Sequence, residues 1–279
     1  MCYNSFITKT LLWVFSKLGA SVGIGSTKLT MNLSPLEVPQ GGKVTGSILL
    51  VGGQVEQNVN AVKAQLVRLW IEEEEVRVDD DGGSHYETRR VTRHDVVQDN
   101  VVSSSFIIKP EEQKQFPVEI EIPLHANIND DDNWWEAWGV AEIGKGKDSK
   151  QGVKLAILPS AMMTQFQVIV TSQLQWGFKD IRPAGSDGQV QMNYNPPAEL
   201  GQMLDEIRCV LRNSSGQLYL NLVLDFKAKK FGDYFKALVG KDDKAASLAF
   251  SEADLQNNQA AIVDTVKQKL QQLTNQVEE

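Results

Sequence analysis

Apolar and polar residues alternate along many segments of this chain. A period of two places successive side chains on opposite faces of a β-strand, so each segment has one apolar face and one polar face. Several such segments, separated by turn-forming residues, predict antiparallel sheets that bury a core between them. The two clearest runs have their apolar residues at Phe116, Val118, Ile120 and Ile122, and at Leu218, Leu220, Leu222, Leu224 and Phe226.

The alternation also predicts how the chain is divided. Residues 61–78 and 85–97 are the longest pair of β-prone runs, and the turn residues between them predict a long hairpin. A further strand is expected at Phe166, Val168 and Val170. Glycine and lysine dominate residues 144–148, which indicates a flexible domain boundary. We predict an all-β protein: an N-terminal helix and hinge at residues 1–26, β-sandwiches at 27–145 and 146–251, and a C-terminal helix at 252–279.

The N-terminal segment has apolar residues at helical spacing and predicts a short amphipathic helix. Its apolar run is too short for a secretory signal or for a membrane span. We expect this helix to dock on its own protein. A weak contact with a membrane surface is the alternative, since tryptophan and lysine suit that interface, and a signal peptide is a third reading. The candidate docking residues are Leu11, Trp13, Phe15 and Leu18.

The C-terminal segment predicts a second helix. Ser251 and Asp254 have the spacing of a capping box, which favours a helix start. Apolar residues then recur at intervals of three and four, from Val263 to Val277, over about two heptads. We expect this stripe to pack on the body of the protein. A partner helix, and thus a homodimer, is the alternative.

Net charge and cysteine content argue against some classes of function and indicate a compartment. The formal net charge of −8 argues against nucleic-acid binding, because 28 Lys and Arg face 36 Asp and Glu. The two cysteines make no disulfide framework, and Cys209 on an apolar strand face predicts a buried free thiol. The cytoplasm is therefore the expected compartment.

The sequence carries no recognisable catalytic, cofactor or metal motif. The three histidines have no short metal-ligand spacing, and no phosphate loop or nucleophile elbow is present. Neither acidic run fits an EF-hand, although an irregular calcium site at Asp130, Asp131 and Asp132 stays open as an alternative. The run Glu72 to Glu75 is expected to protect an exposed strand edge by its charge. We predict no catalytic residue, cofactor or metal, and keep an unrecognised hydrolase as a remote hypothesis.

Three tryptophans follow the acidic loop, at Trp134, Trp135 and Trp138. Core packing at the domain junction would explain them. A partner surface is the alternative, because tryptophan is enriched in interface hot spots.

Several segments resemble the bacterial sporulation-control proteins, and the resemblance covers most of residues 11–250. The first is the opening from Leu12 to Gly25. The tryptophan segment and residues 146–158 are similar to that family's interdomain strand and crossover, where Asp148 matches an acidic linker position. The remaining matches are Leu204–Ile207, Gly216–Leu218, Leu222–Asp225, Gly232–Phe235 and Gly240–Asp243.

The resemblance implies two arrestin-like antiparallel β-sandwiches and a cytoplasmic, non-enzymatic regulator that acts through protein partners. One departure is that the family's basic pair after the strand aspartate is Phe226-Lys227 here, following Asp225. The candidate interdomain or partner surface consists of Trp134, Trp135, Trp138, Asp148, Asp225 and Lys227.

We draw two function hypotheses. The first is a scaffold or regulatory protein that presents strand edges and an interdomain groove to protein partners, for instance by β-strand addition. The second is a peripheral membrane adaptor anchored by the N-terminal helix.

Overall fold

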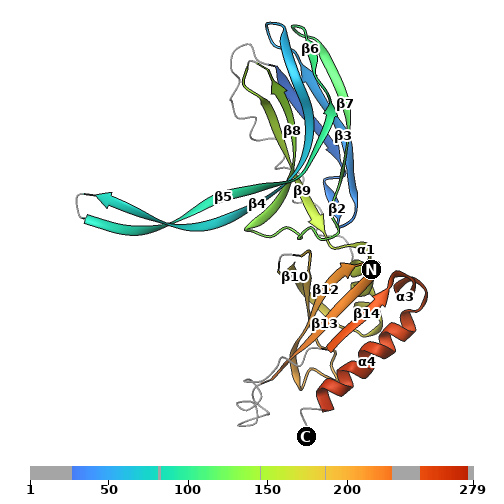
Figure 1. Ribbon diagram of the computed structural model, residues 1–279. Helices are drawn as coiled ribbons and strands as arrows, with labels where there is room; N and C mark the ends of the chain where they lie inside the picture. Colours follow the sequence, from blue (N-terminus) through green and yellow to red (C-terminus); the bar gives the residue numbers. More distant parts are fainter. Residues whose placement is uncertain (1–26, 81–82, 145, 186, 228–245, 276–279) are drawn as a thin grey trace, which may run out of the picture.

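The computed structural model describes residues 27–80, 83–144, 146–185, 187–227 and 246–275. These residues form three sheets, and nearly every strand pairing is antiparallel. The predicted all-β class is therefore confirmed as a mostly-β fold with few helices. Figure 1 shows two units, the upper one built from β1 to β9 and the lower one from β10 to β14 with the helices.

The first unit is a sandwich of two sheets. The smaller sheet has the strand order β1-β3-β7, and the larger one has the order β2-β9-β8-β4-β5, with β6 added to β4. The strands of the smaller sheet are β1 (Lys28–Ser34), β3 (Lys43–Val51) and β7 (Gln113–Glu121). Those of the larger sheet are β2 (Glu37–Pro39), β4 (Gln57–Asp80), β5 (Gly83–Ser103), β6 (Phe106–Ile108), β8 (Asn133–Ile143) and β9 (Ser149–Leu158).

The core of this sandwich follows from the alternation of apolar residues. Ile48 and Leu50 from one sheet and Val62, Ala64 and Leu66 from the other are fully buried and belong to one cluster. Burying each large aliphatic side chain contributes about 1.5–3 kcal/mol, so this face determines the register of the strands.

The predicted domain boundary at residues 145 and 146 is wrong. Strand β9 pairs with β8 along its length, from Trp135 opposite Leu155 to Ala141 opposite Ser149. The described residues of the glycine- and lysine-rich segment, 144 and 146–148, therefore connect two paired strands of a hairpin, and the first unit extends to Leu158. Composition alone does not separate a tight turn from a linker, because both favour glycine and polar residues.

The second unit is one five-stranded sheet with helices on one face. Its strand order is β10-β11-β12-β13-β14. The strands are β10 (Gly177–Pro183), β11 (Val190–Asn195), β12 (Leu204–Ser214), β13 (Gln217–Phe226) and β14 (Ala246–Ser251). The helices are α1 (Ala161–Gln173), α3 (Glu252–Asn257) and α4 (Gln259–Asn275). Among the described residues, helices cover this sheet, whereas the predicted second β-sandwich would cover it with another sheet.

The strand predicted at Phe166 to Val170 is wrong, because these residues lie in α1. Ser160 caps the helix by accepting a hydrogen bond from the Met163 amide at 3.3 Å. Phe166, Ile169 and Val170 are buried at helical spacing, whereas Val168 is 57% exposed. The alternation of Phe166, Val168 and Val170 predicts a strand, but packing against the core of the second unit favours the helix.

The C-terminal helix prediction is confirmed. Ser251 and Asp254 form the reciprocal capping box, and the helix then breaks at Asn258 between α3 and α4. Val266 and Leu270 are buried in the core of the second unit, so the apolar stripe packs on the body of the protein. A homodimer through this helix stays a prediction.

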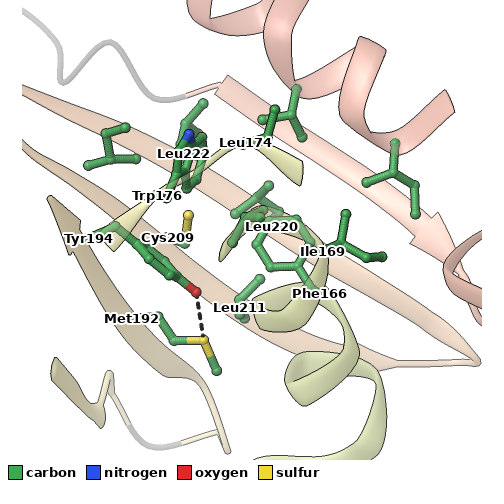
Figure 2. Packing of buried hydrophobic residues seen from close by; sticks show 14 of the residues in the cluster. Phe166, Ile169, Leu174, Trp176, Met192, Tyr194, Cys209, Leu211, Leu220 and Leu222 are labelled. Atoms are coloured by element: carbon green, nitrogen blue, oxygen red, sulfur yellow. Dashed lines mark hydrogen bonds between the residues drawn. The ribbon is translucent and has the colours of Figure 1, made fainter. Parts of the chain in front are cut away.

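Cys209 lies at the centre of that core, as Figure 2 shows. It is fully buried and free, which confirms the predicted structural thiol. Burial raises the pKa of the thiol, so the reactive thiolate is disfavoured. Beside it, the buried hydroxyl of Tyr194 donates to the Met192 sulfur at 3.2 Å. Burial also raises the pKa of Tyr194.

Candidate functional site

A two-stranded ribbon extends from the side of the sandwich. We define the ribbon as Glu72–Asp80 of β4 and Gly83–Val91 of β5. These segments pair with each other throughout, whereas β8 accompanies β4 only as far as the pair Trp70–Asn133. Figure 1 shows the two strands projecting well beyond the body of the molecule. A sheet of two strands is marginally stable alone, so the ribbon depends on its root in the sandwich.

Ion pairs bridge the two strands near that root. Arg93 lies 2.8 Å from a carboxylate oxygen of Glu72 and also pairs with Glu74. Arg90 pairs with Asp132 of the loop before β8. All these side chains are more than a third exposed, so their contribution to stability is small.

The junction between the two units is a buried cluster of neutral polar groups. Gln40 is 3% exposed. Its amide nitrogen donates to the carbonyls of Ala126 at 2.6 Å and Gly188 at 2.8 Å, and its amide oxygen accepts from the Ser160 amide at 3.3 Å. One side chain thus connects the first unit, the start of α1 and the loop between β10 and β11.

Asn127 makes the second connection. Its side-chain oxygen accepts from the Gly188 amide at 2.9 Å, and its nitrogen donates to the Gly185 carbonyl at 3.2 Å. The Trp135 indole donates to the Asn127 carbonyl at 2.8 Å. A buried polar group costs free energy unless it is hydrogen-bonded, so these bonds favour one arrangement of the two units.

Gly188 makes the close approach possible. Its φ of +63° is in the left-handed region, and an added Cβ would lie 2.6 Å from the Cα of His125. Backbone cannot move away as a flexible side chain can, so the junction requires glycine here. No sequence pattern pointed to Gln40, Asn127 or Ser160, because their partners come from distant segments.

The three tryptophans lie on two faces. Trp135 points into the sandwich core, whereas Trp134 and Trp138 lie on the opposite, outer face of β8. Glu136 accepts from both outer indoles, at 3.1 Å and 2.7 Å. The ammonium of Lys150 is 2.9 Å from the Trp138 ring centroid. Partial burial lowers the pKa of Lys150 and the charge of Glu136 opposes this shift.

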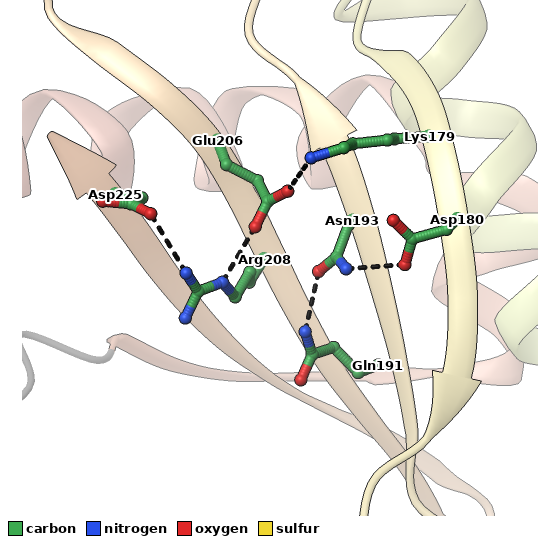
Figure 3. Close-up of polar contacts among 7 residues, drawn as sticks. All are labelled: Lys179, Asp180, Gln191, Asn193, Glu206, Arg208 and Asp225. Atoms are coloured by element: carbon green, nitrogen blue, oxygen red, sulfur yellow. Dashed lines mark hydrogen bonds and ion pairs between the residues drawn. The ribbon is translucent and has the colours of Figure 1, made fainter. Parts of the chain in front are cut away.

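The uncovered face of the second sheet carries an ion-pair network (Figure 3). Glu206 accepts from Lys179 at 2.6 Å and from Arg208 at 2.9 Å, and Arg208 also bonds to Asp225 at 3.0 Å. These bonds lower the pKa of Glu206, against a smaller desolvation effect. They also raise the pKa of Arg208.

The structure does not bring the predicted surface residues together. Asp225 lies opposite Glu206, at the far end of the β12–β13 pair from Asn213, whose side chain donates to the Ser160 hydroxyl at 2.6 Å beside the junction. Lys227 follows β13 there and donates to the Gly201 carbonyl at 2.6 Å. Asp148 accepts from the Ile143 amide in the β8–β9 turn. Asp225, Lys227 and Asp148 therefore do not build the junction, and their role on a partner surface stays a prediction.

The described residues do not support a metal site or a membrane-spanning helix. No group of three or more His, Cys, Asp or Glu side chains among them is arranged to hold a metal ion. In the acidic loop, Asp130 accepts from the amides of Asp132 and Asn133, as an ordinary turn does. No helix in the described part of the chain is long and apolar enough to span a bilayer. The predicted docking residues Leu11, Trp13, Phe15 and Leu18 lie outside this part, as do the family-like segments Gly232–Phe235 and Gly240–Asp243.

A β-sandwich joined by a buried polar junction to a helix-backed sheet defines a two-unit, mostly-β protein. The chain belongs to the Spo0M family, because the family model described as SpoOM protein matches residues 15–229. The predicted family resemblance is therefore confirmed.

The chain is also similar to a Spo0M sequence and to a Spo0M crystal structure, both from Bacillus subtilis. The sporulation-control protein spo0M of Bacillus subtilis (strain 168) is 31% identical over 114 residues, which are 41% of this chain and 40% of that protein. The chain thus aligns with less than half of the relative's length. The crystal structure of Spo0M, sporulation control protein, from Bacillus subtilis has a TM-score of 0.61 at 16% identity. That match covers 88% of this chain and 100% of the other, and it shows a shared fold.

Proposed function

We propose that this protein is a non-catalytic regulatory or scaffold protein of the cytoplasm that binds protein partners through the ribbon. The observation that carries the proposal is the extension of β4 and β5 beyond the pair Trp70–Asn133. A hairpin of this length adds no core, and it exposes backbone groups that another chain can pair with.

Two further observations support a binding role. The relative in Bacillus subtilis carries the name sporulation-control protein, which fits a regulator. The ribbon continues strand β4, which lies in the same sheet as β8 and β9. The polar junction would therefore hold the ribbon in a defined orientation relative to the second unit. A rigid scaffold that holds an exposed arm suits recognition, because binding residues often lie on exposed segments that a rigid scaffold positions.

A shortened variant tests the proposal. Residues 73–90 are replaced by Asn-Gly, so that a two-residue turn connects the paired residues Glu72 and Val91. Tryptophan fluorescence and urea unfolding verify that the sandwich is intact. Full-length and shortened chains are then crosslinked in the host cell at native abundance, and their partners are identified by mass spectrometry.

We expect the full-length chain to retain at least one reproducible protein partner that the shortened chain loses. If both chains recover the same partners, or if the full-length chain recovers none, the proposed function is wrong.

A further inference from the structure

Both outer edges of the ribbon, one on β4 and one on β5, lack a partner strand in the described part of the chain, and the β4 edge is the one that carries the glutamates. On one side, β4 pairs with β5 as far as Asp80–Gly83. On the other side, the last bond towards β8 runs from the Ile71 amide to the Asp132 carbonyl at 2.8 Å. From Glu72 onward this second edge of β4 is therefore open.

Strand geometry determines which residues face the open edge. The N–H and C=O groups of one residue point to the same side of a strand, and those of the next residue point to the other side. Because the Ile71 amide faces β8, the backbone groups of Glu73, Glu75 and Arg77 face the open edge. The register of β4 and β5 shows no shift over this segment, so the alternation holds.

The side chains at two of these positions carry negative charge. Glu73 and Glu75 are exposed and share one face of the ribbon, opposite Arg90 and Thr88. No ion pair of either glutamate occurs among the described residues, since Arg90 pairs with Asp132. On the other face, by contrast, Arg93 compensates Glu72 and Glu74. Glu73 and Glu75 thus face the open edge with no ion pair of their own in the described part of the chain, whereas Arg77 pairs with Asp79 at 3.1 Å.

We propose that the open edge of β4 binds an extended polypeptide segment with lysine or arginine at two alternate positions, opposite Glu73 and Glu75. The inference rests on the proposed function and names the chemistry of the partner. The segment would add as a strand alongside Glu73, Glu75 and Arg77 and continue the line of β8. Residues directly opposite each other in paired strands share a face about 4.5–5.5 Å apart, so two alternate cations would meet Glu73 and Glu75.

Peptide binding to the full chain tests the proposal. A fluorescent peptide that alternates lysine and threonine is compared with a peptide of the same composition whose lysines are contiguous. We expect the alternating peptide to bind about tenfold more tightly, because only its cations can share one face of the added strand. Equal affinity for the two peptides would overturn the proposal.

Charge variants locate the site. The double substitution Glu73→Lys and Glu75→Lys is expected to weaken the alternating peptide about tenfold or more, since attraction becomes repulsion. The matched control is Glu119→Lys with Glu121→Lys, which changes the net charge equally at two exposed, alternate positions of β7. If the control weakens binding as much as the ribbon variant, the effect is general electrostatics and the proposal fails.

A backbone variant tests the binding mode. Glu75→Pro removes an amide that faces the open edge and leaves the β4–β5 hydrogen bonds in place, so it should abolish binding while the ribbon stays folded. In the wild type, exchange-detected NMR should show new protection of the Glu73, Glu75 and Arg77 amides. Binding without this protection, or peptide-induced self-association in analytical ultracentrifugation, would overturn strand addition.

These results separate the two proposals. If the shortened chain loses its cellular partner and the Glu73→Lys, Glu75→Lys variant keeps it, the ribbon binds partners in another way and only the present inference fails. If the shortened chain keeps its partner, the proposed function itself fails.

Discussion

The junction and the ribbon are both polar, but the polar groups of the junction are buried and hydrogen-bonded, whereas those of the ribbon are exposed. At the junction, Gln40 and Asn127 are 3% and 6% exposed, and each makes hydrogen bonds to the other unit. On the ribbon, Glu73 and Glu75 are exposed and the backbone beside them has an open edge.

This difference separates structure from recognition. Buried polar groups with complete hydrogen bonds fix a geometry, because every alternative arrangement leaves some of them unpaired. Exposed backbone groups contribute little to folding, yet they offer a template to another strand. Substitutions at the junction should therefore change stability, and substitutions on the ribbon should change binding.

The largest effect is expected for Gly188→Ala. Its Cβ would combine left-handed backbone strain with a 2.6 Å contact to His125 backbone, and we expect a loss of about 3 kcal/mol in the free energy of unfolding. The control is Gly216→Ala, at φ +72° with no atom within 4 Å of the added Cβ. It should lose only about 1 kcal/mol. Equal losses in urea unfolding would show that the close approach at the junction is unimportant.

A smaller loss is expected for Gln40→Ala. The substitution leaves the carbonyls of Ala126 and Gly188 without their donor, at a cost of about 2 kcal/mol. We also expect the two units to unfold in separate steps, which can be followed by tryptophan fluorescence together with far-ultraviolet circular dichroism. The exposed Gln115→Ala serves as control and should retain a single transition. A single transition in the Gln40 variant would contradict the role of this cluster.

The sequence predicts the sheets of this protein better than its junction. Alternating residues such as Leu218, Leu220 and Leu222 are sufficient for strand β13, because one apolar face must be buried wherever the strand lies. The alternation of side chains along β8 also places Trp135 on the face opposite to Trp134 and Trp138. Treating the three tryptophans as one cluster misses this difference.

The junction could not be predicted in this way. Gln40 and Gly188 are far apart in sequence, and their hydrogen bond depends on how two complete units pack. Helix α1 was missed for a related reason, since Phe166 and Val170 acquire their helical face only against the sheet of the second unit. The ribbon could be predicted in part. The run Glu72 to Glu75 indicates an exposed edge, but the sequence does not show that β8 stops pairing with β4 before this run.

The network on the second sheet should show an intermediate effect with a defined pH dependence. Because Lys179 and Arg208 lower the pKa of Glu206, its carboxylate stabilises the fold above the ordinary value of 4.5. This contribution is lost as the pH falls through the lowered value. Glu206→Gln should therefore cost about 1 kcal/mol at pH 7, allowing for exposed partners, and less at pH 3. A loss that is equal at both pH values in urea unfolding would exclude this electrostatic origin.

The smallest effect on stability is expected on the ribbon itself. Glu73→Lys with Glu75→Lys should change the free energy of unfolding by no more than about 0.5 kcal/mol, since neither side chain contacts a core cluster. Leu66→Ala, at the buried root of the same strand, should cost about 3 kcal/mol because it leaves a cavity in the sandwich. Urea unfolding of both variants thus divides β4 into a structural half and an exposed half. A loss above about 1 kcal/mol in the ribbon variant would mean that the ribbon supports the fold. An unchanged stability together with lost peptide binding would show that the outer half of β4 acts in recognition.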